Sequence, residues 1–112
     1  VLFLCCSATN SAAQTRVIDS LLIELHRPGA EDMRFVDLLN EISYAYNAYK
    51  ADSALLYAKQ ALTVAERGNY RKGIAQACRN TGFAYQRLGK LADATSYYLR
   101  AVPLFEEMKD SL

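Results

Sequence analysis

The chain has 112 residues, of which 52% are hydrophobic and 22% are charged, and its formal net charge is +1. This length suits one domain with a modest core, and the composition is too apolar for a disordered chain. The near-zero net charge argues against a protein that binds nucleic acid through its phosphates. Because glycine (5) and proline (2) are scarce, we expect long helices joined by short connections.

The first 13 residues differ from the rest of the chain and read VLFLCCSATNSAA. An apolar run is followed by small residues, and Ser11 and Ala13 are placed as in a signal-peptidase site before Gln14. This pattern is typical of the back half of a secretory signal peptide, and the run is too short to cross a membrane. We therefore expect export to the periplasm, with residues 1–13 as a signal-peptide remnant. The alternative is an ordinary first helix.

Five helices are expected in chain order. Apolar residues at helical spacing indicate a first helix over 16–25, which the sequence HRPG ends. Further helices are expected at about 31–49, 52–67, 70–88 and 91–108. Gly68 and Gly89 are placed to end the third and fourth of them. Pro103 lies inside the fifth helix, and we expect it to bend that helix because proline removes a backbone donor.

The helix pairs repeat each other, because residues 40–62 align with residues 79–102. Ser43 then matches Gly82, and Ala54 matches Ala94, so small residues recur where the helices of a pair would cross closely. We expect Gly82 to face the second helix of its own pair or of the preceding one. Such a repeat indicates an all-α fold, a right-handed α-solenoid of antiparallel helix pairs with about five helices. The expected units are an N-terminal capping helix (14–30), repeat 1 (31–68), repeat 2 (69–108) and the start of a further repeat (109–112).

The second unit resembles the tetratricopeptide repeat (TPR), whose pattern is W-x2-L-G-x2-Y, then A-x3-F, then P. The residues that carry the resemblance in this unit are Cys78, Thr81, Gly82, Tyr85, Ala94 and Tyr98. In the first unit they are Leu39, Ile42, Ser43, Tyr46, Ala54 and Ala58. The chain departs from the pattern in lacking tryptophan and the final proline, and its period is near 40 rather than 34.

The whole chain is also similar to the exported N-terminal TPR region of Bacteroidetes-type signalling proteins. The segments that carry this resemblance are IDSLLIEL, LLNEISYAY, SALLYAKQAL and YRKGIAQACRNTGFAYQRLGKLADA. The resemblance implies a sensor or scaffold that precedes a membrane helix and a histidine kinase, cyclase or DNA-binding output domain. The alternative is a cytoplasmic TPR regulator or adaptor with a buried N-terminal helix.

The sequence offers few residues for catalysis. It lacks an HExxH motif, a CxxC pair and a phosphate-binding loop. The single histidine, His26, stands at the end of the first expected helix, where a capping or surface role is favoured. Cys78 is the one cysteine beyond the predicted leader, and its apolar neighbours indicate a buried hydrophobic residue. We therefore expect no enzyme, no cofactor and no metal site.

The TPR resemblance implies that the first helix of each pair lines a concave, peptide-binding face. The residues at the matching positions are Asp37, Asn40, Tyr44, Asn47, Gln76, Arg79, Phe83 and Gln86. Aromatic rings flanked by amides and an arginine suit a peptide, although any exposed helix face is polar. The expected partner is a protein or peptide, with neither nucleic acid nor membrane insertion. A homodimer is also expected, because the last helix carries the apolar residues Leu91, Tyr97, Tyr98, Val102, Leu104 and Phe105.

Overall fold

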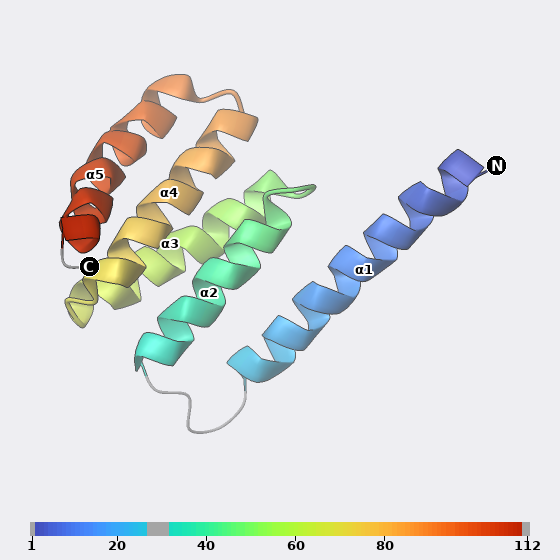
Figure 1. The fold of residues 1–112 in the computed structure, drawn as a ribbon, viewed down its shortest axis with the longest axis horizontal. Helices are drawn as coiled ribbons and strands as arrows, with labels where there is room; N and C mark the ends of the chain where they lie inside the picture. The colour runs from blue at the N-terminus through green and yellow to red at the C-terminus, as the bar shows by residue number, and fades with distance from the viewer. Residues whose placement is uncertain (1, 27–31, 111–112) are drawn as a thin grey trace.

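The computed structural model describes residues 2–26 and 32–110. Its helices, in chain order, are α1 (Leu2–Leu25), α2 (Asp32–Tyr46), α3 (Ala51–Arg67), α4 (Arg71–Arg87) and α5 (Leu91–Asp110). The described residues contain no strand. Figure 1 shows the pairs α2–α3 and α4–α5 stacked on one another, with α1 extending away beside α2. The prediction of an all-α solenoid of five helices is confirmed.

Helix α1 is longer than the apolar stripe that predicted it. It begins at Leu2 and runs without a break to Leu25, since no glycine or proline interrupts this stretch. Residues 2–13 therefore continue the helix outward and do not fold back on it (Figure 1). Val1 and residues 27–30 of the predicted capping segment lie outside the described residues. The division at residue 13 stays a prediction.

Helix α2 ends three residues earlier than expected, at Tyr46. The carbonyl of Tyr46 accepts hydrogen bonds from the backbone N–H groups of Tyr49 (3.0 Å) and Lys50 (2.7 Å), and this closes the chain into a turn. Helix α5 continues through Pro103, and Lys109 and Asp110 belong to its last turn. Residues 111–112 lie outside the described residues, so the start of a further repeat there stays a prediction.

The two glycines expected to end helices do so differently. Gly89 takes the left-handed conformation after α4, with φ 79°. Gly68 is the residue that follows α3, but its φ is −89°, and the left-handed residue is Asn69 with φ 50°. Asparagine tolerates this conformation because its short polar side chain crowds the backbone little. Both turns then close in the same way, with Tyr70 N–H donating to Ala65 O and Lys90 N–H donating to Tyr85 O.

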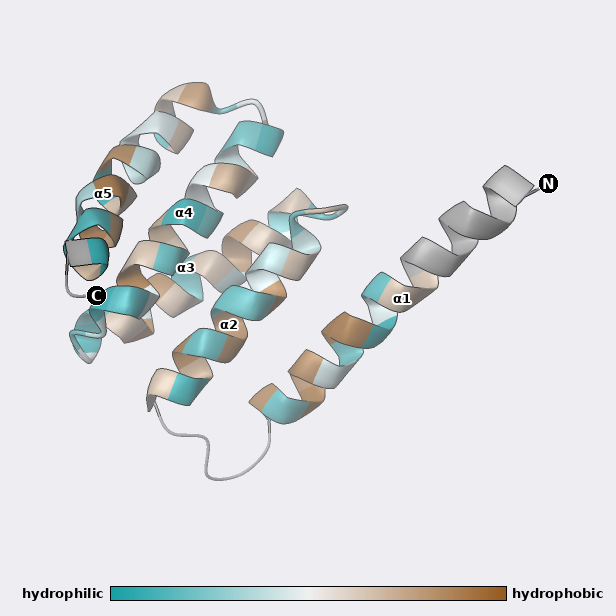
Figure 2. Ribbon diagram, viewed as in Figure 1, coloured by the Kyte–Doolittle hydropathy of each residue, from teal (hydrophilic) through white to brown (hydrophobic). Residues whose placement is uncertain are grey.

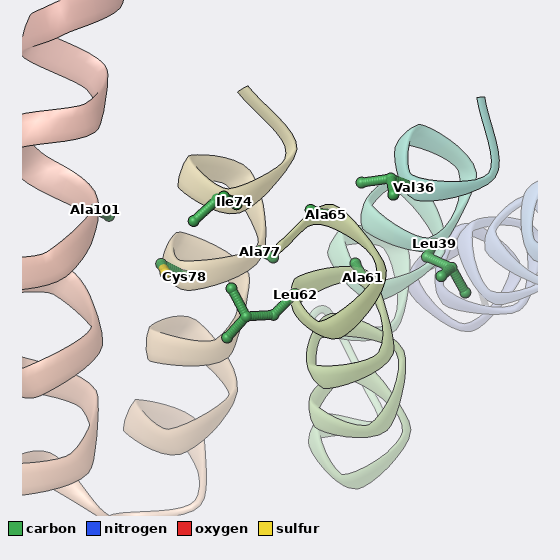
Figure 3. Packing of buried hydrophobic residues seen from close by; sticks show 9 residues of the cluster. All are labelled: Val36, Leu39, Ala61, Leu62, Ala65, Ile74, Ala77, Cys78 and Ala101. Atoms are coloured by element: carbon green, nitrogen blue, oxygen red, sulfur yellow. The ribbon is translucent and has the colours of Figure 1, made fainter. Parts of the chain in front are cut away.

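The hydrophobic core lies between helices, on the inner stripe of each one. Figure 2 shows apolar and polar residues alternating around α2 to α5, as expected for helices with one buried face. Figure 3 shows the central cluster, which is formed by Val36, Leu39, Ala61, Leu62, Ala65, Ile74, Ala77, Cys78 and Ala101. Cys78 is fully buried, as expected, and this burial raises the pKa of its thiol.

Close crossings between helices depend on the small residues that the repeat predicts. Ser43 is buried, and its hydroxyl donates to the carbonyl of Ala54 across the α2–α3 crossing at 2.7 Å. At the matching position in the second pair, a Cβ on Gly82 would lie 2.5 Å from Cε1 of Tyr98 in α5. Gly82 thus faces the second helix of its own pair, as expected.

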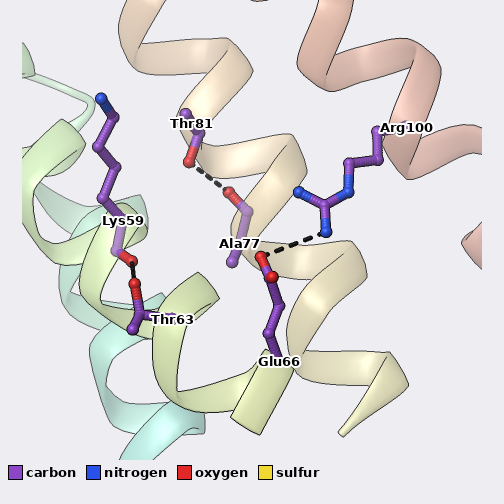
Figure 4. A network of polar contacts seen from close by, with 6 residues as sticks. All are labelled: Lys59, Thr63, Glu66, Ala77, Thr81 and Arg100. Atoms are coloured by element: carbon purple, nitrogen blue, oxygen red, sulfur yellow. Dashed lines mark hydrogen bonds and ion pairs between the residues drawn. The ribbon is translucent and has the colours of Figure 1, made fainter. Parts of the chain in front are cut away.

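Further polar contacts join two helices or lie within one helix. Figure 4 shows Arg100 of α5 forming an ion pair with Glu66 of α3 at 3.2 Å. The hydroxyls of Thr63 and Thr81 donate to the carbonyls four residues earlier in their own helices. Because both members of the Arg100–Glu66 pair are exposed, the pair adds little to stability.

Candidate functional site

Buried asparagines join α2 to α4, and we call Asn40, Asn47 and Asn80 the amide ladder. The Asn80 side-chain amide donates to the backbone oxygen (3.1 Å) and Oδ1 (3.3 Å) of Asn40. The Asn40 amide donates to the carbonyl of Gly73 at 3.2 Å, and the Asn47 amide donates to that of Asn80 at 3.4 Å. All three side chains are buried. The ladder therefore fixes the position of one repeat against the next.

Asp37 also lies at the joint between α2 and α4. Its Oδ1 accepts a hydrogen bond from the hydroxyl of Tyr70 at 2.8 Å. The pKa of Tyr70 is raised to about 12, mainly because the side chain is buried and also because of this hydrogen bond. Of the eight residues predicted for the concave face, Asp37, Asn40 and Asn47 thus make hydrogen bonds across the joint between the repeats.

Three hollows surround the side chain of Tyr44, which is 62% exposed. The largest has a volume of about 500 Å³ and is lined by Val17, Leu21, Asn40, Glu41, Tyr44, Ala45, Gln76 and Arg79. The second, of about 390 Å³, is lined by Tyr44, Asn47, Ala48, Phe83, Gln86 and Arg87. The third, of about 280 Å³, is lined by Ala13, Gln14, Val17, Tyr44, Ala45 and Ala48. We call the walls of these hollows together the Tyr44 surface.

The Tyr44 surface brings together seven of the eight residues predicted for the concave face, and only Asp37 lies off it. It also includes a wall that the sequence reasoning missed, which is formed by α1 through Ala13, Gln14, Val17 and Leu21. The signal for this wall was the width of the apolar stripe on α1. Ile18 is buried while Val17 is 52% exposed, so the stripe is wider than the contact with α2 needs.

Arg79 lies at the centre of the α4 side of this surface. Its guanidinium is 6.0 Å from the ring centres of Tyr44 and Phe83 and 5.6 Å from that of Phe105. Because these rings belong to α2, α4 and α5, the guanidinium makes cation–π contacts with side chains of three helices. Next to it, Phe83 meets Tyr98 edge to face at 5.8 Å, and the Tyr98 hydroxyl donates to Gln86 Oε1 at 2.6 Å.

Nothing in the described residues assembles a metal site, because no three His, Cys, Asp or Glu side chains come together there. His26 donates from Nδ1 to the carbonyl of Leu22 at 2.8 Å, which fits the capping role expected for it. Across residues 2–26 and 32–110, no helix combines the length and the apolar character needed to cross a membrane.

Comparison with known proteins gives one match. The family model of the SusR N-terminal TPR domain, a TPR domain of Bacteroidetes type, matches residues 7–102 of the 112. No curated protein and no solved structure matches the chain significantly. The matched range includes all of α2, α3 and α4, most of α1, and α5 up to Val102.

Proposed function

The chain belongs to the SusR N-terminal TPR domain family, and we propose that it binds its partner at the Tyr44 surface as the sensor or scaffold portion of a longer signal-transduction protein. A TPR domain is a protein-interaction module, and modules of this kind are generally non-catalytic. The partner in this proposal is a protein or peptide segment that lies along α2 and α4.

The observation that carries the proposal is the exposure of Tyr44 among three hollows. Tyr44 is 62% exposed and carries an aromatic ring, so a partner that covers it gains free energy from the burial of apolar surface. The hollows beside it accept side chains, and Gln76 and Gln86 at their edges can pair with the polar backbone of a peptide. Such a combination of an aromatic centre and a polar rim is typical of interaction surfaces.

Substitution Tyr44→Ala is expected to weaken peptide binding at least about tenfold. Peptides would be selected from a displayed random library on the whole chain, and their affinities measured by fluorescence polarisation. Leu56→Ala is the matched control, because Leu56 is 59% exposed but lies on α3, away from the Tyr44 surface. Circular dichroism should show both variants folded. Equal losses in the two variants, or none in either, would contradict the proposal.

Export forms the second part of the proposal, and it is supported by the small residues that precede Gln14. The cytoplasmic alternative keeps the whole of α1 as part of the domain. N-terminal sequencing of the protein from its native host distinguishes the two, because export predicts a mature chain that starts near Gln14. The result also decides whether residues 7–13, which the family model includes, remain on the protein.

Self-association through α5 forms the third part. Leu91, Leu99 and Val102 are 63%, 69% and 51% exposed, and their spacing places them along one side of the helix. An apolar strip of this kind favours pairing with a second copy around a twofold axis. Light scattering at micromolar concentration should therefore detect a dimer that Leu99→Glu converts to a monomer. A monomeric wild-type chain would contradict this part alone.

A further inference from the structure

Arg79 differs from the other arginines that make inter-helix contacts. Arg34 pairs with Glu24, Arg71 with Glu107 and Arg100 with Glu66, and each of these arginines is exposed. Arg79 is half-buried, and no carboxylate among the described residues lies within 4.0 Å of its guanidinium. Its positive charge is instead surrounded by Tyr44, Phe83 and Phe105.

This arrangement leaves hydrogen-bonding capacity unused. The Nε atom of Arg79 is buried and has no acceptor in the described part of the chain. Burial of a charged donor without a partner is unfavourable, and the faces of aromatic rings offset this only in part. The rings also fix the planar guanidinium, so little side-chain freedom is lost when an anion binds to it.

The charges around the largest hollow are unequally distributed. Arg79 lies on its α4 wall and Glu41 on its α2 wall, while Val17, Leu21 and Ala45 supply apolar area. An acidic group is therefore attracted to the Arg79 side and repelled from the Glu41 side. The second hollow, which shares Tyr44 with the first, contains Arg87 and no acidic residue.

We propose that Arg79 binds an acidic side chain of the peptide ligand, and that an apolar side chain next to it occupies the hollow lined by Val17, Leu21 and Ala45. This inference rests on the proposed function, because it names the chemistry of the ligand that the Tyr44 surface receives. The guanidinium lies on the wall of the largest hollow, where it donates to the carboxylate of the ligand in a charge-assisted contact.

The test compares two peptides that differ only in charge, Ac-Leu-Asp-Leu-NH2 and Ac-Leu-Asn-Leu-NH2. Each is titrated into the ¹⁵N-labelled chain at low ionic strength, and the signals of Arg79 Nε–H and of the Tyr44 backbone amide are followed by NMR. Wild-type protein should bind the Asp peptide about fivefold more tightly than the Asn peptide. This preference should shrink as salt is added, because salt screens a partly exposed charge pair.

Variants assign the preference to Arg79. Arg79→Gln should bind both peptides equally, while Arg67→Gln, an exposed arginine on α3 outside the Tyr44 surface, should keep the wild-type preference. Arg79→Lys keeps the charge but loses the planar fork, so it should keep only part of the preference. The comparison of the two peptides on wild-type protein does not depend on whether any variant folds.

Three results would overturn the inference. Equal binding of both peptides by the wild type, with a response at Tyr44, would reject the acidic preference and leave the peptide-binding function standing. Inorganic phosphate that shifts Arg79 Nε–H at concentrations as low as the Asp peptide would indicate a site for a free anion. Absence of any response to either peptide would also reject it, and the library selection with Tyr44→Ala would then still report on the proposed function.

Discussion

Substitution Gly82→Leu is expected to lower the free energy of unfolding by about 2–4 kcal/mol. A Cβ at residue 82 would lie 2.5 Å from Cε1 and 2.6 Å from Cδ1 of Tyr98, which is closer than atoms can approach. Movement of the ring is restricted, because its hydroxyl donates a hydrogen bond to Gln86 and the ring makes an edge-to-face contact with Phe83. A leucine there therefore displaces the Tyr98 ring or separates α4 from α5, and either change loses contacts at this crossing.

Thermal and urea unfolding would measure this effect, and the glycine at residue 68 provides the control. Its φ of −89° is accessible to any residue, and a Cβ there would have only an ordinary contact, 3.7 Å from the carbonyl oxygen of Val64. Gly68→Ala should thus leave stability unchanged or raise it slightly, while Gly82→Ala already lowers it. A Gly82→Leu variant with the wild-type unfolding midpoint would mean that α4 and α5 do not cross as described.

Substitution Asn80→Asp is expected to destabilise the protein by about 3–5 kcal/mol at neutral pH. The side chain of Asn80 is fully buried, and its amide donates to two oxygens of Asn40. An ionised carboxylate has the same shape but no donor, so it would face these oxygens as a buried charge without a partner. The replacement changes almost no volume, so the loss comes from the broken hydrogen bonds to Asn40 and from the cost of the buried charge.

The loss should depend on pH in a defined direction. Burial raises the pKa of the introduced carboxyl in the folded state above its unfolded value near 4. The variant is therefore closest to wild type below about pH 4, and the difference grows as the pH rises from there to the folded-state pKa, above which it is constant. Asn69→Asp, in the exposed turn before α4, is the control and should show no such growth. A pH-independent difference for Asn80→Asp would show that the carboxylate reaches water.

The pattern of small residues was enough to predict the helix pairs, because sterics alone decide where a glycine or alanine is needed. Gly82 and Ser43 could be placed against a partner helix by their repeat positions. Gly73 could not, although a Cβ there would lie 2.6 Å from Cγ1 of Val36. Its crowding comes from Val36 of the preceding helix pair and from the ring of Tyr70, and the aligned segments 40–62 and 79–102 do not include it.

The polar residues of the site were predicted less completely, since a sequence does not state which polar groups face each other. Asn40 and Asn47 were predicted for the peptide-binding face, but both are buried and their amides are bonded across the joint to α4. Asn80 was missed, although it stands between Ala77 and Ala84 at the spacing of a buried stripe. A polar residue within such a stripe is the signal of a buried hydrogen bond. The wall formed by α1 depends on the angle between α1 and α2, which no residue pattern gave.

The alanines of the α3–α4 seam have a consequence for how the domain can respond to a partner. Ala61 and Ala65 on α3 and Ala77 on α4 are all fully buried there. Alanine has no rotamers, so these three residues pack without loss of side-chain entropy, and they have no alternative packing to adopt. A longer side chain could absorb a small displacement by changing its rotamer, but an alanine transmits it directly to the neighbouring backbone. A partner that displaces α4 at the Tyr44 surface is therefore expected to move α3 with it, because Ala77 cannot change its packing against α3.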